Sequence, residues 1–241
     1  TTVEAAGFNM SEDTVKIWEW FVSDRPNLDT FSQGNFSHGI DIANYGKFFE
    51  NNFSTKPTRS TIGIKELMWV GTKVELEVMC YRSNEEVNYY SLDPNSLGSD
   101  ALKKGEWAFV SNQTPIDKKG CVADSFEEQL ELVISKASEL LEQAGSSLEN
   151  TVKAEVFISD PNDFKLMDEV WKKHFPNPPA RFVLPRSGMN HSKAKIEVSF
   201  MALTNNARLK KHGYEIFEEV FDYSFEDKEL NAGINLKLTI A

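Results

Sequence analysis

The chain has few of the side chains that disulfide frameworks and metal sites need. Only two cysteines, Cys80 and Cys121, and four histidines occur among its 241 residues. Two thiols are too few for a thiolate zinc site, and the histidines do not stand in the close pairs of a metal motif. We therefore expect two free thiols, no disulfide framework and no metal site.

The sequence also lacks basic runs and long apolar runs. Its formal charge is −11 and its pI is about 4.9, so it should repel phosphate backbones, and nucleic acid is not an expected partner. No apolar run reaches the roughly 20 residues of a membrane helix, and the first residues do not resemble a signal peptide. No glycine-rich phosphate loop occurs. We expect a cytoplasmic protein without membrane contact.

What the sequence does contain is an internal repeat. Thr-Val-Lys at 14–16 returns at 151–153, and Pro-Thr-Arg at 57–59 returns as Pro-Ala-Arg at 179–181. Each arginine is followed at the same distance by a glutamate in a Lys-x-Glu strand pattern, since 75 − 59 = 16 and 197 − 181 = 16. The repeated Arg/Glu pair is the strongest indication of a functional site.

The two copies are not in constant register. The Thr-Val-Lys segments are 151 − 14 = 137 residues apart, whereas the arginines are 181 − 59 = 122 apart. The first copy thus holds 137 − 122 = 15 extra residues, which we expect in a surface loop between Asp24 and Phe49. A period of this size excludes the common solenoid repeats and indicates duplicated domains.

The second copy predicts the order β-α-β-α-β. Ser125 and Glu128 form a capping box ahead of an apolar stripe at helical spacing, and Gly145 ends that helix. Asp160 and Pro161 open a second helix. Alternating or apolar segments predict strands at 106–111, 151–159 and 194–203.

The first copy looks incomplete. Ala6-Gly7 parallels Ala144-Gly145, so the printed chain opens where a first helix would end. At the other end, 229–241 resembles a turn entering a first strand. We predict a partial unit at 1–82, a complete unit at 83–205, and a linker with the start of a third unit at 206–241. Two explanations stay open: the chain is a fragment, or the sequence omits parts of a longer protein.

The segments EWAFVSNQTPID, LLEQAGSSLENTVKAEVFISDPNDFKLMDEVWKKHFPNPPAR and KIEV resemble the YjgF/RidA (Rid) family over most of 104–203. TVKIWEWFVSD and the stretch ending in KVELEVMC resemble the later two-thirds of another such unit. The resemblance implies an α+β fold of tandem units, each a mixed sheet with six strands and two helices on one face. It also implies a trimer or pseudo-trimeric assembly around a barrel-like centre, with ligand clefts between units.

The resemblance further implies an enamine/imine deaminase that converts small 2-imino or 2-enamino acids to 2-keto acids and ammonia without a cofactor. In such enzymes the Pro-x-Arg arginine holds the substrate carboxylate, and the glutamate of the last strand positions or activates water. These roles carry over to the following residues: Arg59 and Arg181 for substrate binding, Glu75 and Glu197 for catalysis, and Ser111, Asn112 and Gln113 for lining the pocket. The expected partner is a small carboxylated metabolite.

Other interpretations of the same residues stay open. The arginines could be structural ion-pair partners, and the glutamates could be exposed on the polar face of a strand. Asn112 replaces the usual glycine, and Phe-Val-Leu-Pro follows Arg181, so the second pocket departs from the family pattern. The first pocket would have to borrow residues such as Ser111 from a neighbouring unit or a neighbouring chain. The alternatives are an inactive small-acid-binding or scaffold protein and a chorismatase-like hydrolase on the same fold.

Overall fold

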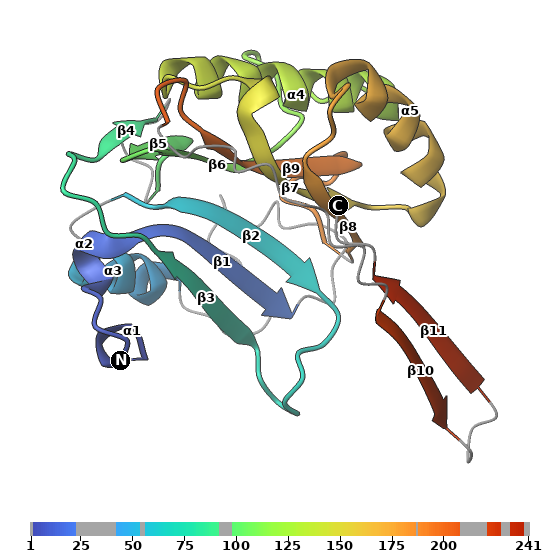
Figure 1. Ribbon diagram of the computed structural model, residues 1–241, viewed down its shortest axis with the longest axis horizontal. Coiled ribbons are helices and arrows are strands. Elements are labelled where there is room, and N and C mark those ends of the chain that lie inside the picture. The colour runs from blue at the N-terminus through green and yellow to red at the C-terminus, as the bar shows by residue number, and fades with distance from the viewer. Residues whose placement is uncertain are drawn as a thin grey trace. The chain divides into compact units, whose positions relative to one another are not determined.

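The computed structural model describes residues 2–22, 42–53, 56–91, 98–186, 188–207, 221–227 and 232–238, with side chains described outside 42–46 and up to residue 207. The chain forms two compact units, Thr1–Ala207 and Arg208–Ala241. The first unit contains two sheets (Figure 1). The predicted boundaries at residues 82 and 205 stay predictions.

A six-stranded mixed sheet forms the larger layer of the first unit. Its order is β4-β5-β6-β9-β7-β8, in which β7 and β8 are parallel and the other neighbouring pairs antiparallel. The strands are β4 (Asn88–Tyr90), β5 (Ala101–Lys104), β6 (Trp107–Gln113), β7 (Thr151–Ile158), β8 (Ala180–Pro185) and β9 (Ile196–Leu203). The predicted β-α-β-α-β order is confirmed by β6, β7 and β9 with the helices between them, and β8 is a further strand that this order omitted.

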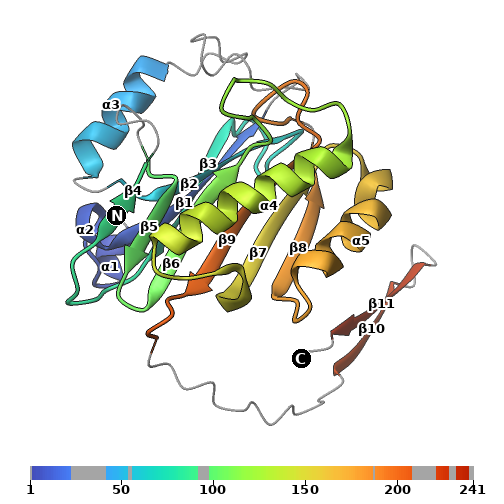
Figure 2. The same cartoon turned by 90° about the horizontal axis from the view of Figure 1, so that it is seen from above.

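Two helices, α4 (Phe126–Gln143) and α5 (Phe164–His174), cover one face of this sheet (Figure 2). The Ser125 side chain caps α4 by accepting from the Glu128 N–H, as the capping box predicts. Gly145 follows the helix with a φ of 72°, a conformation that favours glycine. A short 3₁₀ turn, Pro161–Asp163, precedes α5 and is capped by Asp160. The apolar faces of both helices and the sheet form one buried core.

The smaller sheet has the order β2-β1-β3, from β1 (Thr14–Val22), β2 (Thr58–Ile64) and β3 (Val74–Cys80). Three helices precede or separate these strands: α1 (Thr2–Ala5), α2 (Met10–Asp13) and α3 (Ile42–Asn52). Helix α3 occupies part of the segment in which we expected a surface loop. The rest of that segment lies within 23–41, outside the described residues.

Strands β2-β1-β3 repeat the order, directions and register of β8-β7-β9. Arg59 pairs with Ile17, which pairs with Val78; Arg181 pairs with Ala154, which pairs with Phe200. Each set has an irregularity at its Thr-Val-Lys segment, between Thr14 and Lys16 in one and Thr151 and Lys153 in the other. The offset of 122 also maps α3 onto α5, since 42 + 122 = 164 and 52 + 122 = 174. The extra residues of the first copy therefore lie before Ile42.

The two sheets pack face to face on the side of the larger sheet away from α4 and α5 (Figure 1). Trp18 and Ile62 meet Phe157 in an apolar cluster at this contact. Gly63 of β2 forms a bridge with Gly188, where a Cβ on Gly63 would lie 3.0 Å from the Gly188 Cα. Two glycines thus allow the backbones of the two copies to approach closely.

A buried charge network also joins the sheets. The Lys16 ammonium, with no exposed surface, donates to Ser199 Oγ at 2.8 Å and lies 3.2 Å from Glu155. Glu155 also accepts from the Trp18 indole and the Ser199 hydroxyl, both at 2.7 Å, and from Lys153 at 2.8 Å. The shared contacts satisfy a carboxylate that burial alone would destabilise.

The unit Arg208–Ala241 contains β10 (Phe221–Asp227) and β11 (Ala232–Leu238), which pair antiparallel. A third repeat unit in this region stays a prediction. Cys80 and Cys121 are both free thiols, as predicted. No helix in the described ranges combines the length and apolar composition that crossing a bilayer requires.

Candidate functional site

Arg59 lies on β2, on the sheet face that α3 covers. Its guanidinium binds Glu19 of β1 through two bonds, Nε to Oε1 at 2.8 Å and Nη2 to Oε2 at 2.9 Å. Thr61 donates to the same carboxylate at 2.7 Å. The guanidinium also lies 4.6 Å from the ring centre of Phe49 on α3. Arg59 is thus held by a bidentate ion pair and an aromatic ring, the arrangement that a planar guanidinium favours.

The second copy contributes a residue beside Arg59. The Arg59 backbone N–H donates to Ser111 Oγ of β6 at 2.9 Å, and Ser111 donates in turn to the Ser99 carbonyl. Gly98 lies against the Arg59 side chain, so closely that an added Cβ would be 2.7 Å from Arg59 Cδ. Two of the predicted site residues, Arg59 and Ser111, therefore meet across the two copies.

Arg181 lies at the start of β8, facing α5. One bond of 2.7 Å joins its Nη2 to Asp168, and the guanidinium lies 5.1 Å from the ring centre of Trp171. Nη1 has no hydrogen-bond partner among the described residues. Hydrogen bonds from Lys172 and then Arg181 hold the pKa of Asp168 below its usual value. Asp168 is therefore ionised near neutral pH.

A cavity of about 540 Å³ opens beside Arg181. Aromatic rings and prolines form much of its wall, and charged side chains form the rest. Its lining residues are Asp168, Trp171, Lys172, Phe175, Pro176, Pro178, Pro179 and Arg181. A mostly apolar hollow with a few convergent polar groups has the character of a small-molecule site.

The arginines share an environment that the sequence search overlooked. In each copy the guanidinium lies over an aromatic ring whose residue stands ten positions earlier in the chain. The pairs are Phe49 with Arg59 and Trp171 with Arg181, since 59 − 49 = 10 and 181 − 171 = 10. The carboxylate partners come from different elements, Glu19 from a strand and Asp168 from a helix. The equal spacing from aromatic residue to arginine is visible in the sequence and could have predicted this contact. The carboxylate partners could not be found from the repeat, because neither has a counterpart in the other copy.

The predicted Arg/Glu pairs do not lie together. Glu75 pairs with Trp20, three residues from the Ile17 that pairs with Arg59. Because side chains alternate between faces along a strand, an odd separation puts Glu75 and Arg59 on opposite faces of the sheet. The same separation, Ala154 to Phe157 on β7, divides Arg181 from Glu197. Each arginine faces the helices, and each glutamate faces the other way.

Glu197 has no exposed surface and lies at the centre of a polar cluster between the copies. Its carboxylate pairs with the Arg186 guanidinium, which is also fully buried. Asn190 donates to it through its backbone N–H at 2.7 Å and its side chain at 2.8 Å, and Asn112 donates through its side chain. Arg186 and Asn190 both reach across to the Thr61 carbonyl of β2. The cluster fastens β2 to the loop before β9.

The predicted pocket segment, Ser111 to Gln113, is therefore divided between the surroundings of Arg59 and the cluster around Glu197. Ser111 contacts the Arg59 backbone, whereas Asn112 contacts Glu197. Gln113 is buried and donates to the Ser111 carbonyl. Arg186 and Asn190 escaped sequence analysis because a buried arginine and asparagine in a loop have no periodic pattern. The catalytic and binding roles of the predicted residues stay predictions.

Comparison with known proteins places the larger sheet in a family. The family described as Endoribonuclease L-PSP matches residues 92–204. The mitochondrial protein mmf2 of Schizosaccharomyces pombe is 33% identical over 123 residues, which cover 50% of this chain and 98% of that protein. Reactive Intermediate Deaminase A, a chloroplastic protein of Arabidopsis thaliana, is 30% identical over 53% of this chain and 70% of its own.

A crystal structure of RidA from an Antarctic Psychrobacter overlaps 47% of this chain and 93% of its own, with a TM-score of 0.44 and 25% identity. The residues that match the family, 92–204, contain β5 to β9 with α4 and α5. This part of the chain includes Ser111, Arg181 and Glu197. Through residues 92–204, the chain belongs to the YjgF/RidA family, also called the RutC or L-PSP family.

Proposed function

We propose that the chain is a Rid-type deaminase that hydrolyses small 2-imino or 2-enamino acids to 2-keto acids and ammonia, with the cavity beside Arg181 as its site. The observation that supports the proposal is the incomplete hydrogen bonding of the Arg181 guanidinium. It is oriented by Trp171 and Asp168, yet Nη1 has no partner among the described residues. A buried donor without an acceptor is rare, and a substrate carboxylate would supply one.

The reaction needs a held carboxylate and a positioned water. Arg181 would bind the substrate carboxylate, and the ionised Asp168 would accept a hydrogen bond from the attacking water. Water adds to C2 while the C=N electron pair moves to nitrogen, which takes a proton. The hydroxyl proton on C2 then passes to nitrogen, the C–N bond breaks, ammonia leaves, and C2 becomes the carbonyl of a 2-keto acid. An enamine would first take a proton at carbon to give the imine.

The similarity to Reactive Intermediate Deaminase A supports this chemistry. The equal strand order, register and helix offset of the two copies support tandem Rid-like units, and we propose that a homo-oligomer or a pseudo-trimer of units forms around the face between the sheets. The cytoplasmic location stays a prediction, because relatives are named as mitochondrial and chloroplastic proteins.

A second function has one observation in its favour. Arg59 gives two bonds to Glu19, so a ligand carboxylate would have to compete with an ion pair already formed. This arrangement supports a silent first copy that acts as a scaffold for the second. The two proposals are compatible within one chain, because they concern different arginines.

The test measures ammonia release from freshly generated 2-aminoacrylate. We expect the protein to accelerate it and Arg181→Lys to reduce the acceleration about 10- to 100-fold, because lysine keeps the charge but loses the planar pair of donors, worth about 1.5–3 kcal/mol. Arg59→Lys should have little effect. Lys165→Ala, an exposed substitution on α5 away from the cavity, is the matched control.

The outcomes separate the alternatives. Loss of activity in Arg59→Lys with retention in Arg181→Lys would move the site to the first copy. No acceleration by the folded wild-type protein with any tested imine would remove the enzyme proposal. Calorimetric titration with pyruvate, a 2-keto acid, would then show whether small-acid binding survives without catalysis.

A further inference from the structure

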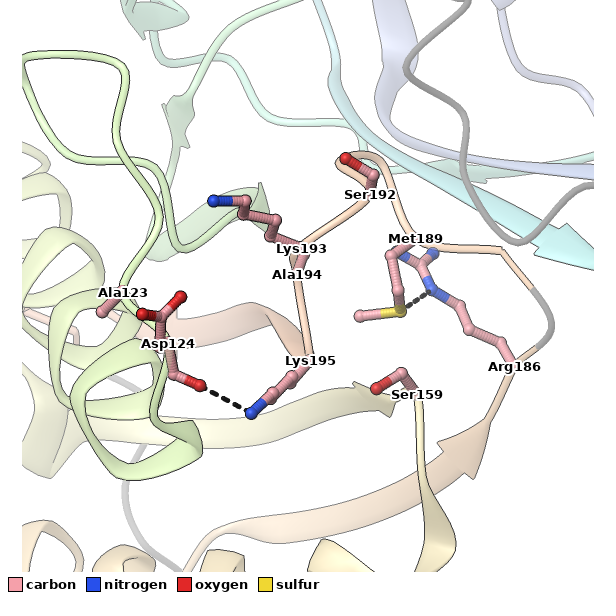
Figure 3. Close-up of a pocket in the computed structure, with 9 residues that line it drawn as sticks. All are labelled: Ala123, Asp124, Ser159, Arg186, Met189, Ser192, Lys193, Ala194 and Lys195. Atoms are coloured by element: carbon pink, nitrogen blue, oxygen red, sulfur yellow. Dashed lines mark hydrogen bonds between the residues drawn. The ribbon is translucent and has the colours of Figure 1, made fainter.

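A second cavity, of about 490 Å³, lies between the segment that precedes α4 and the loop that joins β8 to β9 (Figure 3). It shares no lining residue with the cavity beside Arg181. Its lining residues are Ala123, Asp124, Ser159, Arg186, Met189, Ser192, Lys193, Ala194 and Lys195. The deaminase chemistry proposed above uses none of them.

The base of this cavity contains a buried guanidinium with a poor acceptor. Arg186 has no exposed side-chain surface, and two of its nitrogens have oxygen partners: Nη1 the Thr61 carbonyl at 2.9 Å, and Nη2 Glu197. Its Nε, however, donates to the thioether sulfur of Met189 at 3.0 Å, a contact that Figure 3 shows at the cavity wall. A thioether is among the weakest acceptors in proteins. This donor would gain from an anionic oxygen.

The rest of the wall carries positive charge and is held in place. Lys193 and Lys195 line the cavity, and Lys195 Nζ is fixed to the Asp124 carbonyl at 2.6 Å. Gln129, fully buried on α4, binds the backbone on both sides: its side-chain amide donates to Ala123 and Lys193, and its carbonyl accepts from Lys195. The walls are therefore set before a ligand arrives, which lowers the ordering cost of binding.

Two acidic groups limit the charge of a ligand. The Asp124 carboxylate lies on the wall, and Glu197 lies directly behind Arg186. With three cations against these two carboxylates, the site favours a single negative charge over the double charge of phosphate. The Ser159 hydroxyl, which faces the cavity in Figure 3, offers one more donor.

We propose that this cavity binds a small monocarboxylate, whose oxygen replaces the Met189 sulfur as the acceptor of the Arg186 Nε–H. Lys193 and Lys195 supply the attractive field, and Ser159 donates to the second carboxylate oxygen. Arg186 also donates to the Thr61 carbonyl of β2, so the bound anion lies next to the contact between the two sheets.

The experiment follows the Arg186 Nε–H resonance of ¹⁵N-labelled protein during titration with acetate and, separately, with inorganic phosphate. We expect a saturable shift with acetate and a weaker one with phosphate. Met189→Leu keeps the side-chain volume and removes the sulfur, so acetate no longer displaces an acceptor. Its Kd for acetate should fall about fivefold, the equivalent of about 1 kcal/mol for one weak hydrogen bond.

Two further variants complete the test. Lys193→Met should raise the Kd several-fold, and it is an exposed change that the fold tolerates. Met201→Leu, which lies in the contact between the sheets and away from the cavity, should leave the Kd unchanged. An unchanged or higher Kd in Met189→Leu, or an Nε–H resonance that does not respond to acetate, would overturn the proposal. Phosphate binding more tightly than acetate would overturn its charge selectivity. Because the two cavities share no lining residue, each outcome is independent of Arg181.

Discussion

Acid should weaken the contact between the two sheets in part through the carboxylate of Glu155. Burial opposes its ionisation, but Lys16 and hydrogen bonds from Lys153, Trp18 and Ser199 outweigh burial and lower the pKa of Glu155 from 4.5 to about 2. The pH is lowered for the wild-type protein and for Glu155→Gln. Glutamine keeps the shape of the side chain and cannot ionise. The prediction concerns the difference in unfolding free energy between these two proteins.

The lowered pKa of Glu155 sets the sign and the size of its effect on the free energy of unfolding. A pKa lower in the folded state than in the unfolded chain means that the ionised carboxylate stabilises the fold. Lowering the pKa of Glu155 from 4.5 to about 2 corresponds to about 3 kcal/mol of stability. This contribution is present above pH 4.5 and is lost as the pH falls through about 2. Near neutral pH, Glu155→Gln should therefore be less stable by about 3 kcal/mol.

Urea denaturation at a series of pH values between 2 and 7, followed by tryptophan fluorescence, measures both proteins. The difference between them should shrink as the pH falls, because protonated Glu155 and glutamine then carry the same charge. Other carboxylates titrate equally in both proteins and cancel in the difference. Glu139→Gln, an exposed change on α4, should follow the wild type throughout. A difference that stays constant from pH 7 to 2 would refute the assignment.

Two other substitutions test the contact between the sheets. Gly63→Ala should lower the free energy of unfolding by about 1–3 kcal/mol in urea denaturation, because its Cβ would lie 3.0 Å from the backbone of Gly188, which cannot rotate away. Glu197→Gln should cost about 3–5 kcal/mol at neutral pH, because it leaves the buried Arg186 guanidinium without its counter-charge. A Glu197→Gln protein as stable as the wild type would contradict the structural role given to this cluster.

The larger sheet was predictable because its signals are local. The Ser125 and Glu128 capping box, the helical stripe and Gly145 all act within α4, so a short window of sequence specifies the helix and both its ends. The alternation along β7 likewise depends only on which residues face the core. Elements of this kind form in the same way wherever the rest of the chain lies.

The site was less predictable because it depends on which face a side chain occupies after a loop. The 16 residues from Arg59 to Glu75 include part of β2, a connecting loop and the first residues of β3. The loop geometry sets the register of β3 against β1, and a change of one residue would move Glu75 to the other face. Equal spacing in the two copies therefore predicted equal placement of the pairs. The interpretation of each arginine and glutamate as one site was wrong, because the register places them on opposite faces of the sheet.

The carboxylates beside the two arginines determine how many guanidinium nitrogens each copy has in use. Glu19 stands where the second copy has Val156, since 19 + 137 = 156, and Asp168 stands where the first has Gly46, since 168 − 122 = 46. Each copy thus neutralises its guanidinium from a position that the other leaves without charge. The strand carboxylate meets Arg59 side-on and takes two nitrogens, whereas the helix carboxylate takes one nitrogen of Arg181. Because a ligand carboxylate needs donors that are not already used, we propose the second copy as the binding site, although its sequence departs further from the family pattern.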